Sequence, residues 1–533
     1  MLSWLAVLVL GVSTQTFPNL VGIELDGLGD GSRSKPFVDV AKTLRPWTKP
    51  NSGDRAPVDG QGWPTSDADT VLFDIRPFGT WAPPVDDPEK FMPDWSGTYH
   101  VEFQGQARVG FGEGRRIPIR NQKFDAVQNR TSLEVDVPKG EGLLILQLRE
   151  TKRSANYPAG SGITGLRVIR PGYPADTKAT FTREFLEMLR PFRVLRYMDW
   201  LDTNHNPGFY GDAGHHALDW KKRKLSTDAT QVFDGRAYGA AWEYVVELTN
   251  ATKTDAWINV PIAATDDYVR KLAEFLKRGL RPESKIYIEH SNEVWNFGFP
   301  QYIYNKLAAI DEVKKGGSPL NRDGETNEER LSHRRHAYRL FRISEIFAEV
   351  FGKEAINRRV RPVYASWVIQ PESHYRDVLD WMQKSFGAPK GYFFSLAVAS
   401  YYNAHDASPT ATPDQVLDAM LRSSDAAARF LDPIRSLADS FGLKFMQYEI
   451  GPDTGGGNPV NVANRIRANR LPRMKEIVLH DARRWFAKGG DLYMYFAGPG
   501  AYSRHGCWGI SEDVVQLDTP KWQAIYELTG FKR

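Results

Sequence analysis

Two glutamates in this sequence occupy positions from which they could act together on one bond. Glu293 follows Asn292 in the run Ile286-Tyr-Ile-Glu-His-Ser-Asn-Glu-Val-Trp-Asn296, and Glu449 precedes a Gly-Pro break in Phe445-Met-Gln-Tyr-Glu-Ile-Gly-Pro452. Each glutamate ends a short apolar segment that is typical of a β-strand. Cleavage of a glycosidic bond needs one protonated carboxyl group at the leaving oxygen and one ionised group at the anomeric carbon. The sequence predicts this chemistry if the fold brings the two strand ends together.

Both segments belong to a series of strand-like runs that alternate with amphipathic stretches, which is the pattern of a parallel sheet covered by helices. Seven runs are Arg193–Met198, Ala256–Val260, Lys285–Ser291, Val360–Trp367, Tyr392–Ser400, Lys444–Tyr448 and Asp491–Phe496, and Leu20–Leu25 is the eighth. Helices with apolar residues at spacings of three and four are expected at Asp266–Leu280, Glu328–Val350, Pro413–Phe441 and Asn461–Lys488, with short ones at Pro36–Leu44 and Thr182–Leu189. Eight such units predict a (βα)8, or TIM, barrel, whose active site would lie at the carboxyl ends of the strands.

Residues 51–175 have a different character. They contain six short runs, separated by Gly, Pro and Asn turns, in which polar and apolar residues alternate: VLFDIRP, TYHVEFQG, ARVGFGEG, TSLEVDVP, LLILQLRET and GLRVIRPG. This pattern predicts an all-β, sandwich-like module. Because a parallel strand needs its crossover helix before the next strand, the module is expected as an insertion after the first barrel strand. The barrel would then comprise residues 17–50 and 176–533. The module could bind sugar if Trp63, Trp81 and Trp95 are exposed, or it could wall the cleft or stabilise the barrel.

The composition excludes several classes of protein. With 41% hydrophobic and 25% charged residues, the 533-residue chain fits neither a disordered nor a polytopic membrane protein. A net charge of +4 over this length leaves no electrostatic footprint for nucleic acid. Cys507 is the only cysteine, which excludes an intrachain disulfide and metal sites built from several thiolates. His290 and His405 lack a second histidine at ligand spacing, which favours a hydrogen-bonded or substrate-contacting role, so we expect neither a metal nor a cofactor.

The N-terminal stretch resembles a secretory leader. Trp4–Val12 is apolar and is followed by small polar residues, but it is too short to span a bilayer. No Lys or Arg precedes it, so a buried first strand or a truncated start is the alternative. We expect a leader at residues 1–16 and a secreted or periplasmic protein that is not membrane-bound in its mature form.

The motifs resemble those of glycoside hydrolase clan A. Members of this clan are (βα)8 barrels with an Asn-Glu acid/base pair at the end of strand four and a Glu nucleophile at the end of strand seven, and Asn292, Glu293 and Glu449 match this pattern. Nearly the whole chain, including the inserted module, is similar to secreted bacterial barrel proteins often labelled cellulose-binding proteins or glycosidases. The strings that carry this similarity are LVGIELDG, PFVDVAKTLRPW, LRPFRVLRYMDWLDTN, YIEHSNEVWN and GPGAYSRHGCWGISED.

The resemblance implies a retaining glycoside hydrolase that cleaves a β-linked poly- or oligosaccharide by double displacement. Glu293 would be the general acid and then the base, and Glu449 the nucleophile. Their carboxyl groups would lie about 5–5.5 Å apart, whereas inverting enzymes need roughly 6.5–9.5 Å. Asn292 would bond the sugar 2-hydroxyl. Arg196 would donate to Glu449, or it would form a purely structural ion pair with a nearby aspartate, Asp199 or Asp26.

Aromatic residues at strand ends would complete the site. Tyr401 or Tyr402, at the end of the sixth strand, could orient the nucleophile, and the strand register decides which of them points inward. Four tryptophans could stack against a sugar or could equally be core residues, and His405 is a further candidate contact. These tryptophans are Trp295, Trp200, Trp367 and Trp508.

Two other functions fit the same residues in part. A carbohydrate-binding protein that has lost turnover would use the same fold, although it has no need for an acid and a nucleophile together. A transglycosylase would use both carboxyl groups and would resolve the covalent intermediate with a sugar hydroxyl in place of water.

Overall fold

The computed structural model describes residues 19–74, 85–112, 117–140, 142–205, 217–454 and 460–533. The leader predicted at residues 1–16 lies outside these ranges, as does Trp81. No helix within the described ranges has the length and apolar character needed to cross a membrane.

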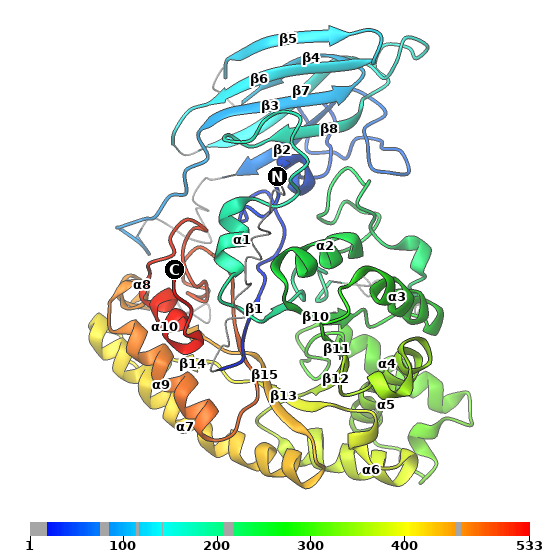
Figure 1. Cartoon of the computed structure of the whole chain (residues 1–533), viewed down its shortest axis with the longest axis vertical. Coiled ribbons are helices and arrows are strands. Elements are labelled where there is room, and N and C mark those ends of the chain that lie inside the picture. The colour runs from blue at the N-terminus through cyan, green and yellow to red at the C-terminus, as the bar shows by residue number, and fades with distance from the viewer. Residues whose placement is uncertain (1–18, 75–84, 113–116, 141, 206–216, 455–459) are drawn as a thin grey trace, which may run out of the picture.

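An eight-stranded parallel sheet forms the centre of the lower part of the molecule in Figure 1. Its neighbouring strands, in order, are β15 (Lys444–Glu449), β13 (Ser395–Ala399), β12 (Val360–Ala365), β11 (Ile286–His290), β10 (Asp255–Val260), β9 (Val194–Arg196), β1 (Val21–Glu24) and β17 (Tyr493–Tyr495). Backbone N–H groups of Gln447 and Ile450 donate to Leu492 and Met494 and so join β15 to β17. The sheet therefore closes into a barrel, and every predicted barrel strand is present.

Helices surround this barrel on the outside (Figure 1). They are α1 (Arg183–Leu189), α2 (Trp242–Thr252), α3 (Asp266–Gly279), α4 (Pro300–Lys314), α5 (Glu328–Phe351), α6 (Asp377–Phe386), α7 (Pro413–Ser440), α8 (Val462–Arg470), α9 (Met474–Ala487) and α10 (Pro520–Thr529). The prediction of a single helix over Asn461–Lys488 is wrong. The helix is interrupted at Leu471–Pro472, because proline lacks the N–H that a helix interior needs. Pro36–Leu44 forms only a 3-10 turn, Val40–Thr43.

The barrel separates two apolar layers. Side chains of one set fill its interior, among them Val194, Trp257, Tyr287 and Met446. The larger core lies between the outer strand faces and the helices. Successive strand residues point to opposite sides, so each buried strand needs apolar residues on both faces. A charged residue within such a strand is consequently a sign of a polar site.

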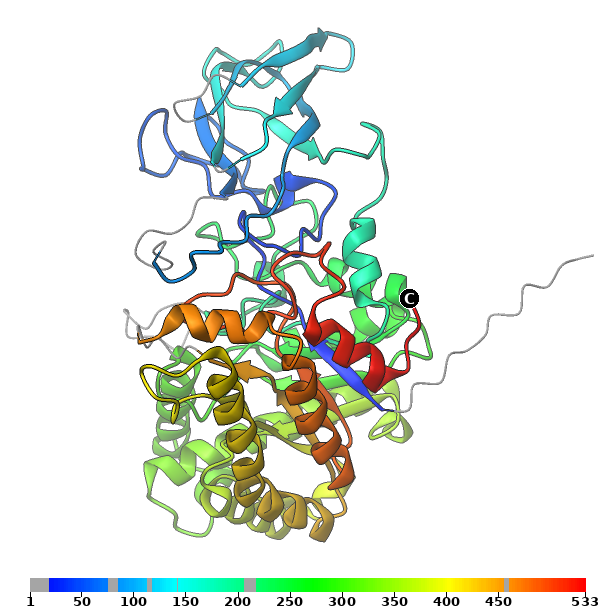
Figure 2. The ribbon, with the colours of Figure 1, turned by 90° about the vertical axis from the view of Figure 1, so that its left-hand side faces the viewer.

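Between β1 and β9 the chain forms two antiparallel sheets, which sit above the barrel in Figures 1 and 2. One contains β2 (Ala68–Asp74), β7 (Leu143–Lys152) and β4 (Gln106–Phe111), and the other contains β5 (Ile119–Asp125), β6 (Arg130–Val137), β3 (Gly97–Gln104) and β8 (Thr164–Ile169). This is the expected β module inserted after the first barrel strand. The polar strand β5 was not among the predicted runs because its side chains are mostly exposed.

The core of this module also takes in residues that precede it. This core includes Val40, Leu44 and Trp47, which pack with the strands of the module. The domain boundaries predicted at 50/51 and 175/176 therefore stay a prediction. Trp63 and Trp95 lie in the same core, 7% and 5% exposed. The expectation that these two are exposed for sugar binding is therefore wrong.

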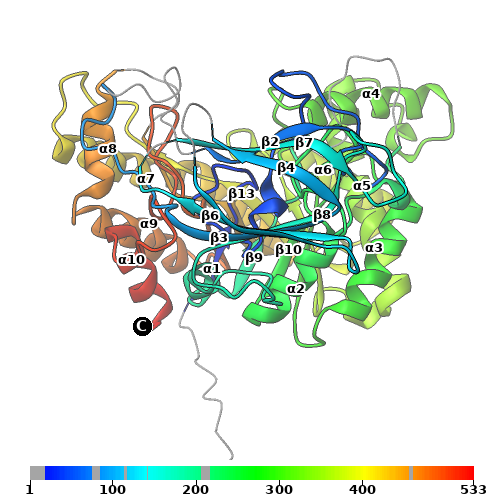
Figure 3. The same ribbon diagram turned by 90° about the horizontal axis from the view of Figure 1, so that it is seen from above.

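Ion pairs connect the module to loops of the barrel. Arg504 forms a bidentate ion pair with Asp86 of the module. Arg470, at the end of α8, donates both to Asp87 of the module and to Glu512 of the barrel. Seen from above, the module lies over the middle of the barrel (Figure 3). These contacts tie the inserted segment to the loop that follows β17.

Candidate active site

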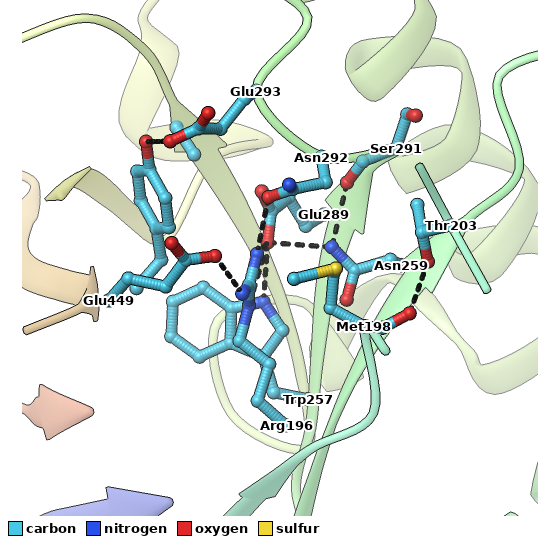
Figure 4. Close-up of polar contacts among 12 residues, drawn as sticks. Arg196, Met198, Thr203, Trp257, Asn259, Glu289, Ser291, Asn292, Glu293 and Glu449 are labelled. Carbon is cyan, nitrogen blue, oxygen red and sulfur yellow. Dashed lines mark hydrogen bonds and ion pairs between the residues drawn. The ribbon is translucent and has the colours of Figure 1, made fainter. Parts of the chain in front are cut away.

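Arg196, at the end of β9, organises the polar centre at the carboxyl ends of the barrel strands. Its side chain is fully buried, and all five of its N–H groups have an acceptor. Nη1 donates to Glu24 at 2.9 Å and to Glu449 at 2.7 Å, while Nη2 donates to Glu289 and Asn292, both at 2.9 Å. The fifth, Nε–H, also donates to Glu289. Figure 4 shows Glu449 on one side of the guanidinium and Glu289 and Asn292 on the other.

Glu289 accepts more hydrogen bonds from Arg196 than either of the other two glutamates paired with it. Its Oε2 accepts from Arg196, from the Trp257 indole at 2.8 Å and from the Asn259 amide at 3.0 Å. The Arg196 guanidinium also lies over the Trp257 ring, 5.8 Å from its centre. Arg196 thus donates to Glu449 as expected from its position on β9, it also pairs with Glu289 and Glu24, and its substrate-binding role stays a prediction. Asp199 and Asp26 are not its partners in any described ion pair.

Glu449 ends β15 and is 5% exposed. Both of its oxygens accept a strong donor, Oε1 from Arg196 and Oε2 from the Tyr401 hydroxyl at 2.7 Å. A Cβ atom at Gly451 would lie 2.6 Å from the Phe496 carbonyl oxygen, so glycine permits the close approach of the chain after Glu449 to the end of β17. This pattern of donors suits a carboxylate.

Glu293 lies just beyond β11 in a different environment. Its donors are neutral, the Tyr448 hydroxyl at 3.0 Å and the Asn296 amide at 2.8 Å. Burial, and after it the charge of Glu449, raises the pKa of Glu293 to about 7. A carboxyl group with such a pKa can hold a proton near neutrality and give it up. The expected 5–5.5 Å between the carboxyl groups of Glu293 and Glu449 stays a prediction.

The backbone around Glu293 is strained. Ser291 and Glu293 have φ values of 60° and 40°, in the left-handed region that residues other than glycine rarely adopt. Asn292, between them, accepts from Arg196, and its amide donates to Asn204 at 3.0 Å. Strain of this kind is characteristic of functional sites, because the surrounding contacts must hold it in place.

Three of the predicted sugar-stacking residues lie where strands end. Trp295 and Trp367 are half-buried and stack on each other, with their ring centres 5.5 Å apart and their planes 7° from parallel. Trp508 is also half-buried and contacts Phe496, whose ring packs against Tyr401. The two groups lie on the Glu293 side and the Glu449 side of the site.

The other candidates are placed elsewhere. Trp200 is 1% exposed and its ring stacks on Phe185 in the outer core, so it has no free face for a sugar. Tyr402 is 1% exposed and belongs to the same core, which leaves Tyr401 as the tyrosine that reaches Glu449. His405 is exposed, and none of its described contacts joins it to the two glutamates. His290 is buried and its Nδ1 lies 3.1 Å from Nδ1 of His336.

Sequence reasoning missed Glu24, Glu289, Tyr448 and Asn204. Glu24 and Glu289 stand inside the buried strand runs VGIE and IYIEH, and a charge within such a run was the signal that could have identified them. Burial raises the pKa of both. Among the described residues, no group of three or more His, Cys, Asp or Glu side chains is arranged to hold a metal ion.

No family model matches this sequence, and none of the curated proteins compared with it matches. Solved structures do resemble it. The GH51 arabinofuranosidase from Xanthomonas axonopodis pv. citri has a TM-score of 0.37 and 11% identity, over 62% of this chain and 63% of that one, so this chain spans less than two thirds of that enzyme. Xylanase10C from Cellvibrio japonicus has a TM-score of 0.33 and 11% identity, over 93% and 99%. Xylanase 10B from Thermotoga maritima has a TM-score of 0.34 and 10% identity, over 65% and 89%.

Proposed function

We propose that this protein is a retaining glycoside hydrolase that acts on a β-linked poly- or oligosaccharide. The observation that carries the proposal is the contrast between two carboxyl groups in one buried cluster. Glu449 accepts from a guanidinium and a phenol, whereas Glu293 has only neutral donors and a pKa raised to about 7. One ionised and one protonated carboxyl group is the pair that glycoside cleavage requires.

In the first step Glu449 attacks the anomeric carbon while Glu293 gives its proton to the leaving oxygen, which produces a glycosyl-enzyme ester and a free alcohol. In the second step the Glu293 carboxylate takes a proton from water, and the resulting attack on the anomeric carbon releases Glu449. Tyr401 and Arg196 keep the attacking carboxylate oriented. The Asn292 amide, with one N–H used by Asn204, has its second N–H for the sugar 2-hydroxyl.

The decisive experiment compares the wild-type protein with Glu449→Ala and Glu293→Ala on a panel of polysaccharides and aryl glycosides. We expect Glu449→Ala to lose turnover by roughly 10⁴-fold. Glu293→Ala should lose most activity on natural linkages but much less on aryl glycosides with acidic leaving groups, which need no protonation. Wild-type turnover by Glu449→Ala on a confirmed substrate would show that the nucleophile assignment is wrong.

Product analysis separates the alternatives. NMR of the first-formed anomer should show retention, and inversion would contradict double displacement. A binding protein without turnover would bind the same sugars and release no product, and a transglycosylase would form longer products when an acceptor sugar is added. Export through the leader at residues 1–16 is part of this proposal and is tested by sequencing the N-terminus of the mature protein.

A further inference from the structure

A pocket of about 420 Å³ lies where loops after β1 and β9 meet the start of the inserted module. Its walls include Asp199, Asn204, Arg45 and Phe233. Asn204 joins it directly to the proposed site, because its side-chain oxygen accepts from the Asn292 amide at 3.0 Å. The volume falls within the usual range of small-molecule sites.

Asp199 supplies this pocket with a carboxyl group. No donor among the described residues bonds the Asp199 carboxyl group, although the Asp199 backbone N–H donates to Glu24. Burial, and after it the charge of Glu449, raises the pKa of Asp199 to about 7. Buried polar groups in proteins are normally paired, so the Asp199 carboxyl group is positioned to bond a hydroxyl group of a ligand.

An aromatic surface completes the pocket. Phe233 is 37% exposed and stacks on Tyr238, with ring centres 4.1 Å apart and planes 9° from parallel. A ring fixed from behind in this way offers its other face, and a pocket lined by both a carboxyl group and an aromatic ring suits the hydroxyl groups and the flat C–H face of a sugar.

The charges in the pocket limit which sugar it accepts. Arg45 is paired with Asp30 at 2.8 Å and Asp74 at 3.0 Å, and His205 is paired with Asp202 at 2.6 Å. The cations that reach the pocket are therefore matched, whereas Asp199 stands close to Glu449. A sugar carboxylate placed here would meet negative charge without a compensating partner.

We propose that this pocket, which we call the glycone pocket, binds an uncharged sugar residue of the substrate and that Asp199 is a substrate-binding residue there. The inference rests on the proposed function, since it assigns the pocket to a sugar residue of the substrate that the two glutamates would cleave. Trp295 follows the proposed acid Glu293 by two residues and stacks on Trp367, whereas the glycone pocket adjoins Asn292 through Asn204.

Binding is measured by calorimetry on protein carrying Glu449→Gln, which prevents turnover. The probes are cellopentaose, xylopentaose and mannopentaose, which are uncharged, and pentagalacturonate, which is anionic. We expect at least one uncharged pentasaccharide to bind and pentagalacturonate to bind at least 10-fold more weakly. Adding Asp199→Asn should weaken the binding of the uncharged probe by about 10-fold, as expected for the loss of one hydrogen bond. Adding Phe233→Ala, at a partly exposed position that tolerates truncation, should weaken it by about 5-fold.

Asp406→Asn is the matched control and should leave the affinity unchanged, because Asp406 is an exposed carboxylate that lies between β14 (Tyr402–Asn403) and α7 and is paired with Arg422 of α7. Unchanged affinity in both Asp199→Asn and Phe233→Ala, tighter binding of pentagalacturonate, or no binding of any uncharged probe would each overturn the inference. Turnover that needs Glu449 but shows no change in KM or kcat with Asp199→Asn would refute this inference and leave the proposed function intact. Binding that depends on Asp199, without turnover on any glycoside, would refute the proposed function and leave this inference intact.

Discussion

The Glu293 carboxyl group should make the folded protein less stable as the pH rises. Burial, and after it the charge of Glu449, moves its pKa from 4.5 to about 7. Because the folded state prefers the protonated form, this contribution to stability is fully present below pH 4.5 and is lost as the pH rises through 7. Glu293→Gln carries a neutral amide of the same shape at every pH and should escape the loss.

The size of the effect follows from the same pKa. The difference between 4.5 and about 7 corresponds to about 3 kcal/mol of unfolding free energy, at 1.36 kcal/mol per pH unit. An unfolding entropy of about 2.1 cal/mol/K per residue amounts to about 1.1 kcal/mol/K for this chain. The Tm of Glu293→Gln relative to wild type should therefore rise by about 3 °C between acid and alkaline pH.

Calorimetric Tm values of both proteins at pH 4.0 and 8.0 provide the measurement. The glutamine changes the hydrogen bonds with Tyr448 and Asn296 by an amount that does not vary with pH, so it cancels when the Tm difference at pH 4.0 is subtracted from that at pH 8.0. Glu372→Gln, at an exposed glutamate paired with Arg376, controls for the loss of a surface carboxylate. A Tm difference that is equal at the two pH values, or smaller at pH 8.0, would refute the reasoning.

Three further outcomes are expected. The kcat/KM of the wild type should fall on the alkaline side with an apparent pKa near 7, since Glu293 acts as an acid only while protonated, and a rate that is flat up to pH 9 contradicts that role. Tyr401→Phe, which removes one of two donors to Glu449, should lower kcat about 10-fold with little change in KM, and an unchanged kcat would show that this hydrogen bond is idle in turnover. The buried Lys521 side chain donates to the backbone carbonyl groups of the two residues that flank Trp508. Lys521→Met should therefore raise KM several-fold and alter the fluorescence of the Trp508 indole. A KM equal to that of the wild type would show that Lys521 has no part in substrate binding.

The barrel could be predicted from the sequence because each of its strands is buried on both faces and so appears as an apolar run. The ends of these runs also located Asn292, Glu293 and Glu449. The strand β5 could not be found in the same way, since its exposed side chains follow no apolar pattern. The break between α8 and α9 was signalled by Pro472, which the periodicity of the surrounding residues concealed.

Details of the site depended on contacts that no local pattern encodes. Tyr401 and Tyr402 are adjacent and identical, and the register at the end of β13 alone makes Tyr401 the partner of Glu449. Trp200 follows a strand just as Trp367 does, yet its ring packs into the outer core. The sequence around a tryptophan near a strand end is similar whether the ring packs in the core or faces a ligand. Its role is therefore decided by the elements that pack against it.

The different environments of the two glutamates follow from how the donors of Arg196 are divided. Glu289 takes two of the five N–H groups and Asn292 takes one, so Glu24 and Glu449 receive one each and none is left for Glu293. A guanidinium without Glu289 would be free to turn toward Glu293 and stabilise its charge, which would lower its pKa. Under the proposed mechanism Glu289 would thus favour the protonated form of Glu293, a residue it does not touch, because it holds the Arg196 guanidinium on the side of Glu449.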